Sequence, residues 1–163
     1  MIASAHIIGG KRLGGAELFY ARLVNALHQR GHVALAMTVP DSLTAAEIHP
    51  EIARIDIPMR GVWDVWSRWQ IGKAIRQYQP NIVQTYMGRA TRLTRLPFGQ
   101  QPVHVARLGG YYAPHGYRHA HAWIVNSPGI HDHLIQHGFP PERVFYISNF
   151  VAPCTPAVPE VLR

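Results

Sequence analysis

Apolar residues along this chain form short continuous runs that alternate with longer stretches in which they recur every three or four positions. The short runs are typical of strands buried on both faces of a parallel sheet, and the longer stretches are typical of amphipathic helices. Strands are predicted over residues 2–8, 33–39, 54–57, 81–86, 103–108, 123–125 and 142–147, and helices over 16–30, 41–49, 62–78, 87–96 and 128–137. This order predicts an α/β fold, a Rossmann-like, doubly wound and mostly parallel sheet of about seven strands with helices on both faces.

A glycine-rich loop joins the first predicted strand to the first predicted helix. It reads Gly9-Gly10-Lys11-Arg12-Leu13-Gly14-Gly15. A loop in this position presents free backbone N–H groups and a helix N-terminus at the carboxyl edge of the sheet, where anions bind. The spacing matches neither the dinucleotide fingerprint nor the P-loop, so an NAD or ATP site is disfavoured. Two interpretations stay open: the glycines bind an anion, or they only turn the chain.

Composition and charge narrow the class of protein. The chain has 163 residues, 47% apolar and 15% charged, which predicts one ordered domain over residues 1–151, followed by a proline-rich linker over 152–163. The formal charge is +7, and the basic residues are arginines except for Lys11 and Lys73. Because arginine favours bidentate contacts with phosphate and carboxylate, an acidic partner is expected, such as a phospholipid, a phosphorylated sugar or a nucleic acid.

The expected location is cytoplasmic. The single cysteine rules out a disulfide framework, and the sequence has neither a run of eighteen apolar residues nor a signal-peptide pattern. The predicted helix over 62–78 carries Trp63, Trp66 and Trp69, which either pack on the sheet or rest on a membrane surface. Packing on the sheet is favoured, and a peripheral position on the inner face of the membrane stays open.

Candidate binding residues lie where predicted strands end. Arg89 and Arg92 follow the strand over 81–86, and we expect both to point at one anion. Arg107 ends the strand over 103–108 and is either paired inside the protein or directed at a ligand, with the second favoured. The next residues combine a glycine pair, which permits close approach, with two tyrosines whose rings suit a sugar. The predicted acceptor-binding residues are Arg12, Tyr86, Arg89, Arg92, Arg107, Gly109, Gly110, Tyr111 and Tyr112.

Eleven histidines invite a metal interpretation, but their spacing does not support one. No His-x-x-x-His pair comes with a third ligand and a general base, so the histidines are expected at the surface and no metal or other cofactor is expected. Neither a nucleophile elbow nor paired carboxylates are present, which disfavours hydrolase chemistry.

Several motifs in sequence order resemble the N-terminal domain of retaining glycosyltransferases of family four, which have the GT-B fold. They are Gly14-Gly15-Ala16-Glu17, Arg30-Gly31-His32-Val33, and the stretches 79–84, 125–127, 138–144 and 147–151. The stretches 107–112 and 149–151 are similar to the branch that builds lipopolysaccharide and other cell-surface glycans. The resemblance implies that Gly14 and Gly15 approach the diphosphate of a nucleotide sugar. That sugar would be held by a C-terminal domain with an E-x7-E motif, which this sequence does not contain.

The function implied by the resemblance is sugar transfer, with retention, to an anionic cell-surface glycan or lipid-linked acceptor. The chain would be the acceptor-binding half of the enzyme and inactive alone. Tyr86 and the stretch 107–110 stand where many relatives carry histidines, so no catalytic acid or base is assigned. The alternative is a non-catalytic anion- or nucleic-acid-binding module of the same fold. Nucleic acid is disfavoured because the chain lacks RNA-binding and helix-turn-helix signatures.

Overall fold

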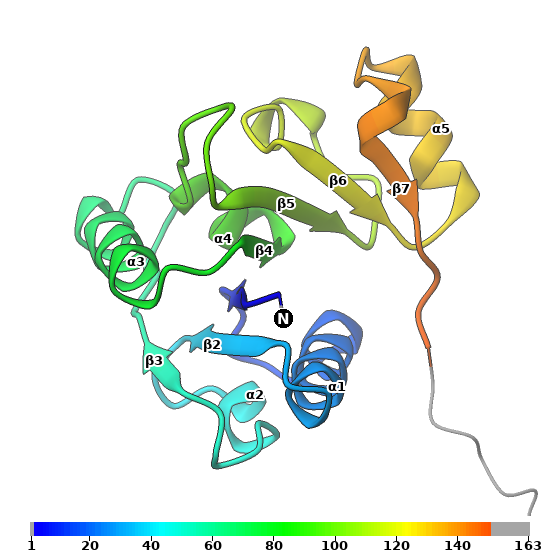
Figure 1. Ribbon diagram of the computed structural model, residues 1–163. Helices are drawn as coiled ribbons and strands as arrows, with labels where there is room; N and C mark the ends of the chain where they lie inside the picture. The colour runs from blue at the N-terminus through cyan, green and yellow to red at the C-terminus, as the bar shows by residue number, and fades with distance from the viewer. Residues whose placement is uncertain (1, 151–163) are drawn as a thin grey trace, which may run out of the picture.

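The computed structural model describes residues 2–150, which form one sheet of seven parallel strands. The strand order is β3-β2-β1-β4-β5-β6-β7, as Figure 1 shows. All seven strands coincide with predicted runs to within a few residues, and the sheet is parallel throughout. Their bounds are β1 Ser4–Ile8, β2 Val33–Thr38, β3 Arg54–Asp56, β4 Ile82–Tyr86, β5 Val103–Leu108, β6 Ala122–Val125 and β7 Val144–Tyr146.

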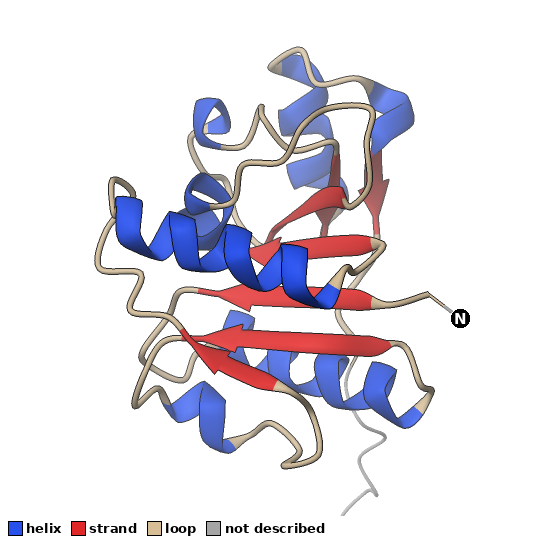
Figure 2. Cartoon of the chain, turned by 60° about the vertical axis from the view of Figure 1, so that its left-hand side comes forward, coloured by secondary structure: helices blue, strands red, loops and turns tan. Residues whose placement is uncertain are grey.

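Helices cover both faces of the sheet (Figure 2). Right-handed crossovers place α1 and α2 on one face, and α3, α4 and α5 on the other, because the chain changes its direction of travel across the sheet after β3. This is the doubly wound architecture expected from the sequence. The helices are α1 Gly15–Gln29, α2 Leu43–Ala46, α3 Val65–Tyr78, α4 Met87–Leu93 and α5 Pro128–Gln136, with 3₁₀ turns η1 Pro114–Gly116 and η2 Pro141–Arg143.

Local sequence explains where these helices begin and end. At the end of α1, Gly31 has a φ of +72°, and the N–H of His32 donates to the Leu27 carbonyl at 2.9 Å, as in a Schellman motif. At the start of α3, the Asp64 carboxylate accepts from the Ser67 N–H at 3.0 Å. These caps satisfy backbone groups that the helices themselves cannot pair.

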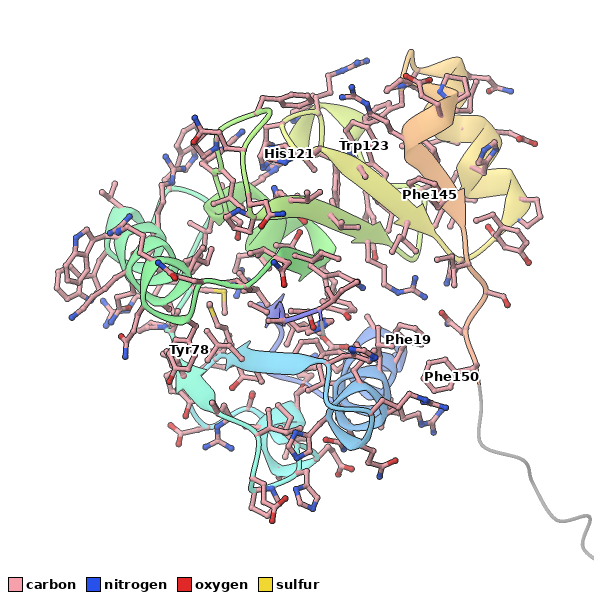
Figure 3. All side chains as sticks on the ribbon, viewed as in Figure 1. Phe19, Tyr78, His121, Trp123, Phe145 and Phe150 are labelled. Carbon is pink, nitrogen blue, oxygen red and sulfur yellow. The ribbon has the colours of Figure 1, made fainter. Side chains whose placement is uncertain are left out.

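Apolar side chains form a core on each side of the sheet. On the α1 face, Phe19, Tyr20 and Val24 pack against Ile8, Ala36 and Tyr86. On the opposite face one cluster lies under α3 and α4 and a second under α5. On the α1 face, Val103 of β5 and Phe145 of β7 stay exposed, at 38% and 50%. Figure 3 labels Phe145 on the ribbon of β7. Both faces of a parallel sheet are normally covered by other elements. Within residues 2–150, the part of the α1 face at Val103 and Phe145 is exposed instead.

The three tryptophans do not pack on the sheet, which corrects the favoured interpretation. The buried stripe of α3 consists of Ser67, Ile71, Ala74 and Ile75. Trp63, Trp66 and Trp69 are instead 86%, 61% and 48% exposed. The rings of Trp66 and Trp69 stack with centroids 4.9 Å apart, and the Lys73 ammonium lies 5.4 Å from the Trp69 ring centroid.

The expectation that the histidines lie at the surface is wrong for three of them. His6, His104 and His121 are buried. The His6 ring bonds Ser4 Oγ and Tyr86 Oη, each at 3.0 Å, and His104 Nε2 lies 3.0 Å from Thr85 Oγ1. Burial lowers the pKa of His6 to about 4 and that of His104 to about 3, so both rings are neutral at pH 7.

Candidate functional site

The candidate site lies at the switch point of the sheet, between β1 and β4. The connections after these two strands run in opposite directions, and in open α/β sheets ligands bind in the crevice outside the carboxyl ends of the strands at such a point. The glycine loop after β1 and the start of α4 meet here, because Arg89 Nη1 donates to the Gly9 carbonyl at 3.1 Å. The glycine loop therefore lies at the ligand edge of the sheet, where the sequence placed it.

The loop ends in an uncapped helix N-terminus. Gly14 is the N-cap of α1 and supplies no side-chain cap, while its carbonyl accepts from the Leu18 N–H at 2.9 Å. Within residues 2–150, no acceptor is bonded to the N–H groups of Gly15 and Ala16. A Cβ at Gly15 would meet no atom within 4 Å. These amides and the helix dipole favour an anion at this place.

Glu17 occupies the inner side of the same loop, which the sequence did not indicate. This residue is 7% exposed, and its Oε2 atom lies 3.0 Å from the place of a Cβ at Gly14. Its Oε1 atom fills the place of a Cβ at Gly10. A side chain at Gly10 or Gly14 would therefore press on the Glu17 carboxylate, which would have to move. A bound anion would approach from the open side, at Gly15.

Arg107 is paired inside the protein, contrary to the favoured expectation that it is directed at a ligand. It is 6% exposed, and its guanidinium carbon lies 3.9 Å from the ring centroid of Phe19 in α1. Its Nη2 donates to Asn149 Oδ1, and burial lowers the pKa of the guanidinium. Phe19 also packs edge-on against Phe150, with centroids 5.4 Å apart (Figure 3). Arg107 and Phe19 therefore hold the segment that follows β7 against the first turns of α1.

The other predicted arginines make separate contacts. Arg89 is exposed and reaches Gly9 across the switch point, whereas Arg92 Nη2 lies 3.3 Å from His115 Nε2. Arg12 is exposed on the glycine loop. The expected pair of Arg89 and Arg92 on one anion is not formed, because the two side chains turn toward different neighbours.

Tyr86 is a core residue and cannot contact an acceptor directly, which corrects that prediction. It is 2% exposed, and its Oη bonds His6 Nδ1 at 3.0 Å and Gln84 Nε2 at 2.9 Å. Its ring packs edge-on against Tyr20, with centroids 5.0 Å apart. Burial raises the pKa of the Tyr86 phenol, so it stays neutral and acts as a hydrogen-bonding group of the core.

The two tyrosines after β5 do not form one platform. Tyr111 is 68% exposed, packs edge-on against His133 at 5.3 Å between centroids, and covers Gly129 at the start of α5. Tyr112 is half-buried and stacks on Tyr117, with centroids 6.0 Å apart. Gly109 is exposed, and Gly110 is partly covered by the Tyr112 ring. Of the two rings, Tyr111 presents the larger open surface.

Two further residues at this edge were missed by sequence reasoning. Met87, the first residue of α4, has a φ of +65°, a strained conformation directly at the switch point. Tyr117 is 2% exposed, and its Oη has no hydrogen-bond partner among residues 2–150. That Oη lies 3.3 Å from the place of a Cβ at Gly88, just after Met87. No local pattern indicates Tyr117, because its position depends on how η1 packs on α4.

Fold and site together define a class of protein: a Rossmann-like domain with a glycine loop and a free helix N-terminus at the switch point, as in one half of a GT-B glycosyltransferase. The sequence model of Glycosyltransferase Family 4 matches residues 13–153. The chain belongs to this family, as the resemblance indicated.

Two curated relatives are lipopolysaccharide core biosynthesis glycosyltransferases of Rhizobium meliloti (strain 1021). LpsD is 30% identical over 110 residues, which cover 64% of this chain and 30% of LpsD. LpsE is 29% identical over 150 residues, which cover 84% of this chain and 40% of LpsE. The chain thus spans about a third of the length of these relatives.

Solved structures of low sequence identity share the fold. The lipopolysaccharide outer core galactosyltransferase WaaB in its apo form has a TM-score of 0.68 at 14% identity, covering 91% of this chain and 46% of WaaB. Anabaena Alr3699/HepE in complex with UDP-glucose has a TM-score of 0.65 at 15% identity, covering 91% of this chain and 44% of that protein. Within the described part of the chain, no helix has the length and apolarity needed to cross a membrane.

Proposed function

We propose that this chain is the acceptor-binding N-terminal half of a nucleotide-sugar-dependent glycosyltransferase. The reaction proposed is transfer of a sugar, with retention, onto an anionic cell-surface glycan or lipid-linked acceptor. The observation that carries the proposal is the uncapped N-terminus of α1, with open space at Gly15. Family membership and the two lipopolysaccharide relatives support glycosyl transfer over the alternative of a nucleic-acid-binding module.

In this proposal the glycine loop faces the diphosphate of the donor. Negative charge builds on the diphosphate as the bond to the sugar breaks. The Gly15 and Ala16 amides and the dipole of α1 are preorganised to stabilise that charge. The proposed reaction therefore needs no metal ion at this loop.

The donor itself is proposed to lie on a second half, outside this sequence, which carries the E-x7-E motif. The relatives are longer than this chain, and the exposed Val103 and Phe145 leave part of one sheet face available for packing. The linker predicted over 152–163 lies outside the described residues. The predicted domain boundary at residue 151 stays part of the proposal.

For the acceptor, the exposed members of the predicted set are the best candidates. Arg12 lies on the glycine loop and Arg89 follows β4 at the switch point, and both would bind anionic groups, while Tyr111 offers an open ring for a sugar. Arg92, Gly109, Gly110 and Tyr112 lie at the same edge of the sheet. Arg107 would act by fixing Phe19 and α1, without touching the acceptor.

We further propose that the protein is cytoplasmic and docks on the inner face of the membrane through the tryptophan face, defined by Trp63 just before α3 and by Val65, Trp66 and Trp69 at the start of α3. Tryptophan favours the headgroup region, and the basic Lys73 and Arg60 beside this face suit anionic lipids. The first turn of α3 follows β3 and thus lies at the carboxyl edge of the sheet. A membrane at this face would bring a lipid-linked acceptor close to the crevice.

Vesicle co-sedimentation tests the docking surface separately from transfer. Binding should be about thirtyfold stronger to vesicles with anionic phospholipid than to neutral vesicles, because Lys73 and Arg60 would each contribute about 1 kcal/mol near the surface. The double variant Trp66→Ser, Trp69→Ser should lose most of this binding. Tyr111→Ser should keep it, because Tyr111 packs against His133 of α5 and is not part of the tryptophan face. Equal binding by the tryptophan variant would contradict the proposed docking surface.

The decisive test of the proposed reaction is Gly15→Leu in the complete reading frame. A Cβ at Gly15 meets no atom within 4 Å, so the leucine side chain would extend into the open side of the loop. We expect sugar transfer to fall by about 10²–10³, the loss typical of removing one preorganised donor. Gly61→Leu is the matched control, because a Cβ there also meets no atom within 4 Å. Equal transfer by Gly15→Leu and the wild type would refute the role of the loop.

A further inference from the structure

A second chemically distinctive cluster lies at the edge of the sheet opposite the glycine loop. His28, His49 and Glu51 each place one ligand atom within 4.8 Å of the others. His28 Nε2 is 3.7 Å and His49 Nδ1 is 3.9 Å from Glu51 Oε2. His28 is in the last turn of α1, and the other two precede β3. They line a hollow of about 370 Å³ together with Asn25 and Gln29.

The backbone that carries this cluster is held in place from several sides. Ile48 and Ile52, on either side of His49 and Glu51, are buried in the core under α1. Asn25 of α1 donates to the Glu47 carbonyl at 2.8 Å and accepts from the His49 N–H at 2.9 Å. The Ile52 N–H donates to the His49 carbonyl at 3.0 Å across a turn with Pro50 at its second position. The ligands therefore project from a fixed loop and a fixed helix end.

We propose that His28, His49 and Glu51 bind a divalent transition-metal ion, with Zn²⁺ as the best match. Two imidazoles and one carboxylate are a zinc donor set, and water would complete the tetrahedron. Ligand atoms around tetrahedral zinc lie about 3.3 Å apart, as follows from bonds of about 2.0–2.1 Å. The observed separations of 3.7 and 3.9 Å need only small rotations of the exposed His49 and Glu51 and the partly exposed His28. His49 Nδ1 would exchange its long contact of 3.3 Å with the Glu51 N–H for the metal.

The metal would stabilise the folded protein and would take no part in the proposed reaction, which lies at the opposite edge of the sheet. It would join the C-terminal end of α1 to the loop before β3. An ion that binds only the folded protein stabilises it in proportion to the logarithm of its free concentration. Because protons compete with a metal for imidazole nitrogen, the effect should fade as the pH is lowered.

Thermal unfolding with Zn²⁺ tests the proposal, with excess chelator as the reference. With free Zn²⁺ about a hundredfold above the dissociation constant, we expect the midpoint to rise by roughly 5–10 °C. Mg²⁺ should give no rise, because it prefers oxygen ligands. Titration with Co²⁺ should give the visible absorption of a tetrahedral site that saturates at one ion per chain.

Variants separate this site from other histidines, above all His133 and His137, whose rings are 4.3 Å apart on α5. His49→Ala and Glu51→Gln should each lose most of the rise and the Co²⁺ spectrum. His137→Ala, the matched control, should keep both. A rise that survives in His49→Ala, or disappears in His137→Ala, overturns the assignment. Thermal unfolding in excess chelator shows whether each variant folds without the metal. If His49→Ala does not fold, His28→Gln provides a second test.

Discussion

Lowering the pH from 8 to 5 should destabilise this protein because it contains buried neutral histidines. His6 and His104 have pKa values of about 4 and about 3 in the folded state, below the usual 6.5, because burial disfavours the charged ring. The unfolded chain takes up protons as the pH falls through 6.5, and the folded chain does not. Stability is therefore complete above pH 6.5 and decreases steadily as the pH falls toward 4 and 3.

The magnitude follows from this difference in proton uptake. At pH 5, 1.5 units below 6.5, each histidine costs about 2 kcal/mol at 1.36 kcal/mol per unit, and the two together cost about 4 kcal/mol. Burial also lowers the pKa of His119, which adds in the same direction. Carboxylates contribute little at this pH because their usual pKa values are near 4. A loss of this size is a large fraction of the free energy of unfolding of a small domain.

Urea denaturation followed by circular dichroism at pH 8 and pH 5 measures this loss. His104→Gln lowers stability at pH 8 but removes one titrating group, so its loss between the two pH values should be about 2 kcal/mol smaller than that of the wild type. His115→Gln, at an exposed position, should keep the wild-type pH dependence. Equal pH dependence of His104→Gln and the wild type would refute the reasoning.

Three further substitutions test the site and its support. Tyr86→Phe removes the hydroxyl shared by His6 and Gln84, so it should cost about 1–3 kcal/mol in urea unfolding and leave the KM for acceptor unchanged. Asp64→Ala removes the N-cap of α3 and should cost about 1 kcal/mol in the same assay. Gly10→Ala places a methyl group against the Glu17 carboxylate and should lower the thermal midpoint, whereas the double variant Gly10→Ala with Glu17→Ala should recover part of the loss.

The arrangement of strands and helices was predictable because the local signals agree with one another. Most strands are short, mainly apolar runs, although β3 is Arg54-Ile55-Asp56. The alternation of strands and helices leaves few topologies once crossovers are right-handed. The glycine loop was found for the same reason, since it directly follows a strand and begins a helix. These features depend on residues that are close in sequence.

The side-chain environments were not predictable in the same way. Residues 62–78 contain two helical stripes, and the small Ser67 and Ala74 mark the one that packs close to the sheet, while the tryptophans follow the other. Tyr86 lies in a strand buried on both faces, so its position at the strand end did not make it accessible. The burial of His104 arises from β5, the neighbouring strand β4 and the segment before β6 together, and no local pattern encodes it.

The contacts of Arg107 explain why its burial is compatible with a role in the proposed reaction. The Ile147 N–H donates to the Val125 carbonyl at 2.9 Å, so β7 leads directly into the segment that carries Asn149 and Phe150. Asn149 and Phe150 then contact Arg107 and Phe19, and Phe19 follows the bare amides of Gly15 and Ala16 by one turn of α1. Under the proposed function, a movement of a second half attached after this segment would be transmitted first to α1, the helix that faces the donor diphosphate. Arg107 would thereby fix the position of the glycine loop relative to the segment that follows β7. Catalysis by positioning of the reactants requires such a fixed geometry.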